Sequence, residues 1–238
     1  MHDIGYLVDN VEKYKNALIQ KKYFSKKNTV AYVILNKKPV VLKWFAPGFK
    51  NNMQNEYSIL KNLPSSINTP NIIEKDEENN VLVISHIFGK NLCNIINDEN
   101  ILISIKQNLM MYLAKWFYKF HSYFHENKNY RIRGDSILRN FILTNRIWGL
   151  DFEESRLGKP VEDIAAMCCS ILSTEPMFKN WKFQLSKIFI NSYKDYSNLK
   201  LSKINEQISY SLLEKIQYRP DDEIIFRKYS ERISNIGL

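Results

Sequence analysis

The sequence predicts an α+β fold in which an antiparallel sheet comes first and helices make up most of the remainder. Two runs rich in β-branched and aromatic residues, Thr29–Leu35 and Pro39–Phe45, are separated only by Asn36-Lys37-Lys38, which is typical of a β-hairpin. From about Asn97 onward, apolar residues recur at intervals of three and four, the period of a helix. A chain of 238 residues is long enough for one domain or for two small lobes.

The N-terminal segment up to about Lys27 admits two interpretations. Asn10 can cap a short helix that places Val11, Tyr14 and Leu18 on one side. Alternatively, Ala17–Phe24 is already a strand. The sequence alone leaves both open.

Composition narrows the class of protein. The formal net charge of +9 fits an anionic partner such as nucleic acid, or a Lys- and Asn-rich background with lysines scattered in pairs. No apolar run has membrane-spanning length, and the N-terminus lacks a signal-peptide pattern, so we expect no membrane span. Three cysteines cannot make a disulfide framework, and Cys168 and Cys169 fall in an apolar stretch where buried thiols are usual. We therefore expect a cytoplasmic protein.

Lys43 interrupts the second apolar run, between Leu42 and Trp44. A charge in an apolar strand is costly unless it is paired or functional, although an edge strand can turn a lysine to solvent. After Pro47-Gly48, apolar residues at helical spacing predict a helix that Asn51 or Asn52 caps and Pro64 ends. Glu56 falls about one turn into that helix. We expect Lys43 to pair with Glu56, the alternatives being Glu74 or no partner.

Further elements are predicted along the chain. Val81–Ile87 has strand character, and the stretch from about Asn97 to His125 reads as one long helix without Gly or Pro. His121 and His125, four residues apart on that helix, are a possible metal pair but lack a third ligand nearby, so a structural role is expected. Four later helices are expected after Pro160, over Trp181–Tyr193 and Ile204–Tyr218, and from Pro220 to about Ile233.

The stretch from Arg131 to Asp163 carries the residues on which a function depends. Transfer of a γ-phosphoryl group requires cations that neutralise the phosphates and a group that orients the attacking hydroxyl. Because Mg²⁺ prefers oxygen ligands, the carboxylate of Asp151 and the amide carbonyl of Asn140 are candidate metal ligands. Asp135 lies five residues before Asn140, the offset expected between a catalytic Asp and a metal-binding Asn. Arg139 adds positive charge next to them.

These residues together resemble the protein-kinase-like superfamily. The branch most similar in pattern is the aminoglycoside and choline phosphotransferase type, together with the small RIO-type and KEOPS-complex kinases. The similarity is carried by Gly134-Asp135, by Asn140 and by Asp151-Phe152-Glu153; it covers about Thr29–Leu172, is specific at Arg133–Glu153 and is loose upstream. It implies an antiparallel-sheet N-lobe over 1–88, a helical C-lobe over 89–238, and ATP with Mg²⁺ between them.

The resemblance also implies roles for other residues. Lys43, held in place by Glu56, would face the α- and β-phosphates of the nucleotide. Asp163 would brace the catalytic loop by hydrogen-bonding its backbone. The end of the apolar run Val81–Ile87 would meet the edge of the adenine ring. The adenine-side candidates are therefore Ile84, Ser85, His86 and Ile87. No chemical role follows for the His86 imidazole.

The sequence departs from the family pattern in three places. Arg133 replaces the usual His before Gly134, which puts the packing of the loop in question. No glycine-rich loop occurs between Ile19 and Val33, where only Ser25, Asn28 and Thr29 can approach phosphates. No long segment with an Ala-Pro-Glu anchor follows Asp151, so an activation loop controlled by phosphorylation is not expected.

The leading hypothesis is an ATP-dependent phosphotransferase with a hydroxyl acceptor, on a small molecule or a protein. The basic charge favours an alternative, a KEOPS-type kinase subunit with tRNA or a protein complex as partner. The missing glycines and Arg133 favour another, a pseudokinase scaffold that holds nucleotide. The stretch Trp181–Tyr218 is rich in Lys and Ser rather than in acidic residues, so we do not expect an aminoglycoside acceptor.

Overall fold

The computed structural model describes residues 3–25, 27–126 and 129–238, and the chain divides into two compact units. Unit 1 comprises Met1–Phe88 and Trp148–Glu154, and unit 2 comprises Gly89–Ile147 and Ser155–Leu238. The return segment Trp148–Glu154 brings Asp151 and Glu153 into the same unit as Lys43 and Glu56.

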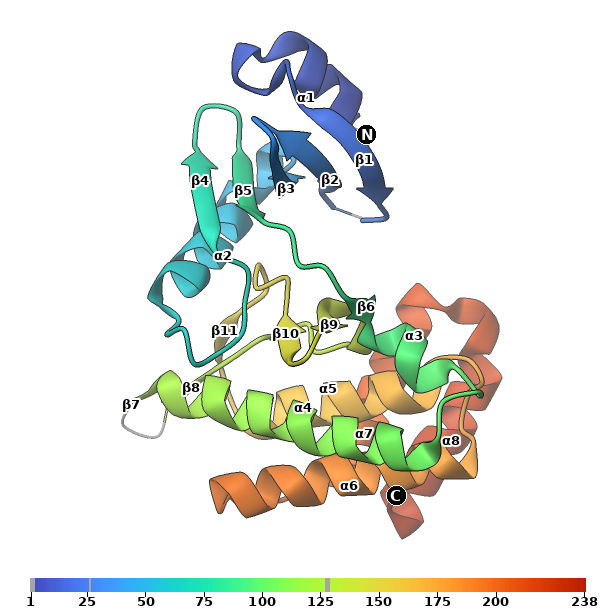
Figure 1. Cartoon of the computed structure of the whole chain (residues 1–238). Coiled ribbons are helices and arrows are strands. Elements are labelled where there is room, and N and C mark those ends of the chain that lie inside the picture. The colour runs from blue at the N-terminus through green and yellow to red at the C-terminus, as the bar shows by residue number, and fades with distance from the viewer. Residues whose placement is uncertain (1–2, 26, 127–128) are drawn as a thin grey trace. The chain divides into compact units, whose positions relative to one another are not determined.

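Unit 1 is built on a five-stranded antiparallel sheet with the strand order β1-β2-β3-β5-β4 (Figure 1). Its strands are β1 (Leu18–Tyr23), β2 (Thr29–Leu35), β3 (Lys38–Trp44), β4 (Ile72–Asp76) and β5 (Val81–Ser85). Its helical elements are α1 (Ile4–Asn10), η1 (Glu12–Tyr14), η2 (Pro47–Phe49) and α2 (Lys50–Asn62). The small antiparallel sheet that the sequence predicts is therefore confirmed.

The hairpin between β2 and β3 forms where the sequence predicts it. Leu35 pairs with Lys38, so Asn36 and Lys37 alone make the turn, with φ of 50° and 64°. Positive φ at both central residues is the signature of the turn that matches strand twist, and Asn tolerates it well.

The N-terminal segment contains both a helix and a strand. Asp3, not Asn10, caps α1 by accepting a hydrogen bond from the Gly5 amide at 3.1 Å. The strand over Ala17–Phe24 is present as β1, whereas Asn10 is the last residue of the helix. For α2, the expected cap at Asn51 or Asn52 is wrong, because the helix continues directly from η2 and begins at Lys50 without a side-chain cap.

The two faces of the sheet have different neighbours. Alternate side chains of β3, Val40 and Leu42, join the core that the sheet forms with Ile4 and Leu7 of α1. Because successive side chains of a strand point to opposite faces, Lys43 lies on the other face. β3 is an interior strand, so the interpretation of Lys43 as a solvent-facing residue of an edge strand is wrong.

Unit 2 is mainly helical. Its α-helices are α3 (Leu92–Asn97), α4 (Ile103–Tyr123), α5 (Pro160–Ser173), α6 (Asn180–Ser197), α7 (Ile204–Lys215) and α8 (Glu223–Ile236). Short 3-10 turns are η3 (Leu138–Asn140), η4 (Ile216–Tyr218) and η5 (Pro220–Asp222). Short strands are β6 (Lys90–Asn91), β7 (His125–Glu126), β8 (Asn129–Ile132), β9 (Phe141–Leu143), β10 (Ile147–Gly149) and β11 (Arg156–Gly158), and β10 runs across the boundary into unit 1.

The long helix expected from about Asn97 to His125 is present as α4, but it is shorter than predicted and is preceded by a separate helix, α3. Asp98 ends α3 in an extended conformation, and its carboxylate accepts a hydrogen bond from the Asn100 amide at 2.9 Å. A short polar side chain that accepts from a backbone amide two residues on competes with the helix, so α4 starts only at Ile103. No Gly or Pro marks this break, which is why helical periodicity alone misses it.

The core of unit 2 is aromatic. α4 and α6 run side by side (Figure 1), and Phe117 of α4 meets Phe189 of α6 with ring centroids 5.7 Å apart. Trp116 stacks on Phe120 at 5.5 Å. The three cysteines are free and buried, as the apolar context of the adjacent pair predicts. In the described part of the chain, no helix has both the length and the hydropathy required to cross a bilayer.

Candidate active site

Lys43 is the centre of a buried polar cluster in unit 1. Its ammonium lies 2.6 Å from Glu56 Oε2, 2.6 Å from Asp151 Oδ1 and 2.8 Å from Glu153 Oε2. The expected pairing of Lys43 with Glu56 is confirmed, and the alternative partner, Glu74, instead pairs with Lys13. Three acidic residues from two distant segments of the chain thus converge on one ammonium group.

Glu56 links helix α2 to both the lysine and the return segment. One carboxylate oxygen binds Lys43, and the other accepts a hydrogen bond from the Phe152 amide at 3.2 Å. Glu56 is 1% exposed, so both oxygens need such partners to offset the cost of burial. This arrangement holds the backbone of the Asp-Phe-Glu triplet at a set distance from β3.

The electrostatics of the cluster keep the lysine charged. Burial lowers the pKa of Lys43, but Asp151, Glu56 and Glu153 more than offset this and hold it well above its ordinary value. Burial raises the pKa of Glu56, an effect that Lys43 opposes. One ammonium against three carboxylates leaves an excess of two negative charges in the group. Such an excess suits a divalent cation.

The donor set fits magnesium chemistry. Glu56, Asp151 and Glu153 each offer one carboxylate oxygen, and these oxygens lie within 4.8 Å of one another. Hard cations such as Mg²⁺ select carboxylate oxygens and retain several waters. Asp151 is the most accessible of the three, with a side chain 37% exposed against 1% for Glu56 and 9% for Glu153.

Asp151 has a strained backbone. Its φ is 62°, in the left-handed region that costs a non-glycine residue roughly 1 kcal/mol. Asp tolerates this region better than most residues, and such outliers concentrate at functional sites. The strain turns the Asp151 carboxylate toward Lys43 while Phe152, fully buried, anchors the next position.

Glu153 and Asn28 belong to the cluster, although sequence reasoning did not select them as site residues. The Asn28 amide nitrogen donates to Glu153 Oε2 at 2.6 Å, from the loop that joins β1 to β2. The acidic residue two positions after Asp151 was a usable signal for Glu153. No local pattern marks Asn28, because its partner is 125 residues away.

The loop that carries Asp135 and Asn140 lies in unit 2. The Asn140 amide nitrogen donates to the Asp135 carboxylate at 3.0 Å and to the Asp135 carbonyl at 3.1 Å. These bonds orient the Asp135 carboxylate and do not use the carbonyl oxygen of Asn140. Arg139 has an exposed side chain, and its backbone carbonyl accepts a hydrogen bond from Asn91 at 2.8 Å.

Asp163, in the first turn of α5, organises the backbone of this loop. Its carboxylate accepts hydrogen bonds from the Arg133 amide at 2.7 Å, the Gly134 amide at 3.2 Å and the Ser136 hydroxyl at 2.9 Å. The predicted bracing role of Asp163 is thus confirmed. Burial alone would raise the pKa of Asp163, but hydrogen bonds from His121 and from the Arg133 backbone lower it below its ordinary value.

His121 contacts Asp163 and so helps to hold the same loop. Its Nε2 lies 3.0 Å from Asp163, and its Nδ1 lies 2.8 Å from the Tyr193 hydroxyl. The imidazole is 1% exposed and links α4, α5 and α6, so the structural role expected for it is confirmed.

Arg133 is accommodated by aromatic rings. The side chain is fully buried, with its guanidinium carbon 4.6 Å from the centre of the Phe141 ring and 5.3 Å from that of Trp116. Arginine stacks well on aromatic faces and is weakly hydrated for a cation. The loop therefore keeps its backbone bonds to Asp163 with arginine in place of the usual histidine.

The four adenine-side candidates lie at the end of β5. Ile84 is buried and pairs with Val41 of β3, and Ile87 is half-buried. The Ser85 hydroxyl accepts a hydrogen bond from the Asn71 amide at 2.9 Å. The His86 ring stacks on Tyr32 with the ring centroids 3.9 Å apart. Burial is the larger cause that lowers the pKa of His86, and the charge of Lys21 lowers it further.

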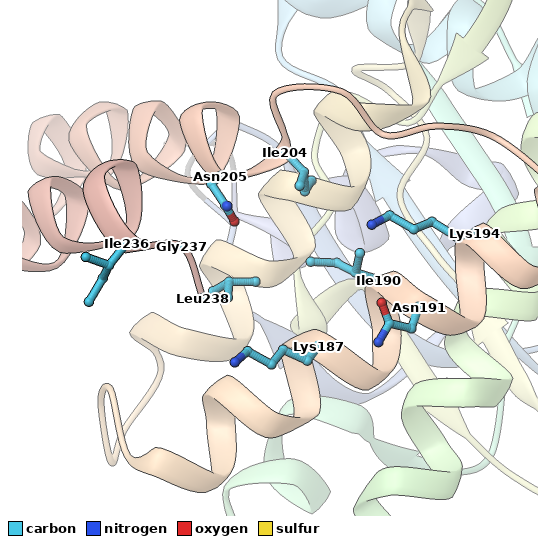
Figure 2. A pocket seen from close by; sticks show the side chains of 9 residues that line it. All are labelled: Lys187, Ile190, Asn191, Lys194, Ile204, Asn205, Ile236, Gly237 and Leu238. Atoms are coloured by element: carbon cyan, nitrogen blue, oxygen red, sulfur yellow. The ribbon is translucent and has the colours of Figure 1, made fainter.

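Two cavities occur elsewhere. One, of about 680 Å³, lies in unit 1 between the end of α2, the segment that follows it and Trp148. The other, of about 290 Å³, lies in unit 2 and is shown in Figure 2, where Lys187 and Lys194 of α6 face Asn205 of α7 and the C-terminal residues. Neither cavity is lined by a candidate site residue, so neither adds to the cluster around Lys43.

Comparison with solved structures establishes the fold. The aminoglycoside phosphotransferase APH(4)-Ia aligns with a TM-score of 0.66 at 10% identity, over 99% of this chain and 98% of that chain. A ternary complex of a thermostable mutant of APH(4)-Ia with ADP and hygromycin B gives 0.64 at 11%, over 98% and 99%. A choline/ethanolamine kinase family protein from Mesorhizobium loti gives 0.61 at 12%, over 97% and 90%. The chain has a protein-kinase-like fold.

The protein-kinase-like fold predicted from the sequence is confirmed, with an antiparallel-sheet N-terminal part and a helical C-terminal part. No protein-family model matches the sequence, and no curated protein does. In the protein-kinase-like fold a lysine on the third strand pairs with a glutamate on the following helix, the arrangement that Lys43 of β3 and Glu56 of α2 adopt. The similar structures named above give no support for a tRNA or protein-complex partner.

Proposed function

We propose that this chain is an ATP- and Mg²⁺-dependent phosphotransferase that transfers the γ-phosphoryl group to a hydroxyl of a small molecule. The observation that carries the proposal is the cluster in which Lys43 meets Glu56, Asp151 and Glu153 within 2.8 Å. Phosphoryl transfer depends on positioning and charge neutralisation, and this cluster combines a cation for phosphate oxygens with carboxylates for a metal. The solved complex of a similar fold with ADP supports nucleotide binding.

Each residue has a defined role in this proposal. Lys43, held by Glu56, binds the α- and β-phosphates, and Asp151 with Asn140 supplies oxygen ligands to the metal. Bound Mg²⁺ would neutralise charge on the phosphates. Asp135 orients the acceptor hydroxyl and takes its proton, with its carboxylate already set by Asn140 at 3.0 Å. The exposed side chain of Arg139 adds positive charge beside the transferred group.

The adenine is proposed to meet the residues from Ile84 to Ile87. The position of this segment at the end of β5, directly before the boundary of unit 1 at Phe88, supports this. The His86 ring nitrogen Nδ1 is buried and makes no hydrogen bond with any described group. It is therefore available to an adenine edge.

The acceptor is proposed to be an uncharged or anionic alcohol. Six lysines against three acidic residues occur in Trp181–Tyr218, the helical region where similar enzymes would choose the acceptor. Polycationic aminoglycosides require acidic surroundings, and this region is basic. An alcohol without positive charge is the better match.

The test is phosphate release and transfer from labelled ATP with Mg²⁺, using a panel of sugars, sugar phosphates, choline, ethanolamine, gentamicin and hygromycin B. Asp135→Asn should lower turnover by about 10²–10⁴-fold while retaining nucleotide binding, because it removes a base and keeps the size of the side chain. Asp151→Ala should weaken metal-dependent nucleotide binding itself. Glu223→Gln, on the exposed face of α8, is the matched control and should match wild type.

The outcomes separate the functions considered. Nucleotide binding without transfer to any acceptor, unchanged by Asp135→Asn, would indicate a nucleotide-holding scaffold. Absence of ATP and ADP binding by the wild-type protein would reject the proposal altogether. Transfer that depends on added tRNA would reject the small-molecule acceptor and favour an RNA-linked kinase.

A further inference from the structure

The loop between β1 and β2 lacks glycine, yet it is tied to the candidate metal site by a side chain. Asn28 is the last residue before β2 and is 8% exposed. Its amide nitrogen donates to Glu153 Oε2 at 2.6 Å. Beside it, Lys27 forms an ion pair with Glu154. This end of the loop is thus fastened to the segment that follows Asp151 by two adjacent side chains.

The other end of the Asn28 amide has no partner among the described groups. Its carbonyl oxygen Oδ1 is buried and accepts no hydrogen bond from any group that the structure describes. Because a carboxylate can only accept, the nitrogen must face Glu153, so rotating the amide cannot satisfy the oxygen. A buried acceptor without a donor is costly, and such a cost calls for a specific explanation.

Glu153 is held from two sides. Its Oε2 lies 2.6 Å from the Asn28 amide nitrogen and 2.8 Å from the Lys43 ammonium. The Asn28 bond persists if Lys43 turns to phosphate oxygens, because it does not involve the lysine. Asn28 is therefore placed to keep the Glu153 carboxylate directed at the cluster when Lys43 changes partner.

We propose that Asn28 is a positioning residue for the divalent cation, an inference that rests on the proposed function. Its amide nitrogen fixes Glu153, a carboxylate of the acidic cluster that would join Asp151 in holding the cation. Its carbonyl oxygen would accept a hydrogen bond from a water on Mg²⁺, a cation that keeps several of its waters. In this chain a side-chain amide thus contributes at the place where other kinases bring the backbone close with glycines. The proposal accounts for the bond from the Asn28 amide nitrogen to Glu153 and for the buried carbonyl oxygen that has no donor among the described groups.

The experiment measures the binding of metal and of nucleotide directly and does not depend on turnover. Affinity for Mn²⁺ is measured by electron paramagnetic resonance in the presence of ADP, and affinity for ADP in EDTA is measured by calorimetry. Asn28→Ala should weaken Mn²⁺ binding by about 10–100-fold, the usual effect of removing a partner of a metal ligand. Metal-free ADP affinity should change less than about threefold, because Asn28 acts through the cation.

Asn55→Ala is the matched control. The Asn55 amide donates to the backbone carbonyl of Glu153 at 3.0 Å, so this variant removes an asparagine bond to the same residue without touching the carboxylate. It should leave Mn²⁺ affinity within about threefold of wild type. Asn28→Ser provides a second variant with a different side chain, should Asn28→Ala fail to melt cooperatively.

A double-mutant cycle completes the design. If Asn28 acts through Glu153, combining Asn28→Ala with Glu153→Gln should weaken Mn²⁺ binding less than the product of the two single effects. The inference is overturned if the wild type binds Mn²⁺ with ADP and Asn28→Ala binds it equally well. It is also overturned if Asn55→Ala causes the same loss, or if the two effects multiply. Failure of the wild type to bind ADP at all would instead overturn the proposed function and, with it, this inference.

Discussion

Replacing Asp163 by Asn tests how the loop that carries Asp135 and Asn140 is held, because the substitution preserves shape and removes only the charge and two acceptor sites. The carboxylate oxygens divide four donors between them. Oδ2 accepts from the Arg133 amide at 2.7 Å and faces His121 at 3.0 Å, and Oδ1 accepts from the Gly134 amide at 3.2 Å and the Ser136 hydroxyl at 2.9 Å. An asparagine amide offers an acceptor on one side only.

The expected loss of stability depends on which of the four donors can instead act as hydrogen-bond acceptors. The His121 imidazole can change tautomer and the Ser136 hydroxyl can rotate, so both can accept from an amide NH₂. The amides of Arg133 and Gly134 cannot, and either orientation of the asparagine leaves one of them opposite a donor. Losing one hydrogen bond to a buried charge costs about 1.5–3 kcal/mol, and the remaining bonds weaken as the acceptor becomes neutral. We expect Asp163→Asn to lower the free energy of unfolding of unit 2 by roughly 3 kcal/mol.

The assay is urea unfolding followed by tryptophan fluorescence at pH 7, with Trp116 and Trp181 reporting on unit 2. Glu223→Gln is the control, because it removes the same charge from an exposed pair with Arg227 and should cost less than about 1 kcal/mol. The difference between wild type and Asp163→Asn should also depend on pH. The pKa of Asp163 is lowered on folding, so its contribution is present above the ordinary value of 3.8 and is lost as the pH falls through the folded pKa. A loss below about 1 kcal/mol at pH 7, or a difference that does not shrink in acid, would refute the reasoning.

Three further predictions follow from other buried groups. Lys43→Met leaves three carboxylates without their shared ammonium, so we expect unit 1 to lose roughly 3 kcal/mol by calorimetry, with Mg²⁺ restoring part of it; equal stability without metal would contradict this. Burial lowers the pKa of Lys182 to about 8, so wild-type stability should rise with pH between about 8 and its ordinary 10.5, and Lys182→Met should abolish that rise in pH-dependent melts. Because all three cysteines are buried, an aromatic disulfide reagent should titrate no thiol in the native protein and three after unfolding; rapid reaction of any native thiol would show that its site opens.

The sequence was informative where structure is local. The hairpin around Asn36-Lys37 follows from its turn residues, and α2 follows from apolar spacing that ends at Pro64. The pairing of Lys43 with Glu56 was also predictable, because the cost of a charge in an apolar strand demands a partner and the next helix supplies one. The break at Asp98 was not, because nothing in helical periodicity reports a side chain that bonds the backbone amide two residues on.

Taken by itself, the sequence determined the antiparallel hairpin and most element types, since each depends on neighbours within a few positions, and it also predicted that Asp163 braces the loop carrying Asp135 and Asn140. The tertiary structure alone decided that β3 is an interior strand, that Glu153 joins the cluster and that Asn28 reaches it across 125 residues. It also decided that Arg133 fits where a histidine is usual, because Trp116 and Phe141 come together only in the folded core. All of these have the same physical reason. Burial and charge compensation depend on the groups that surround a side chain, and those groups come from residues distant in the sequence.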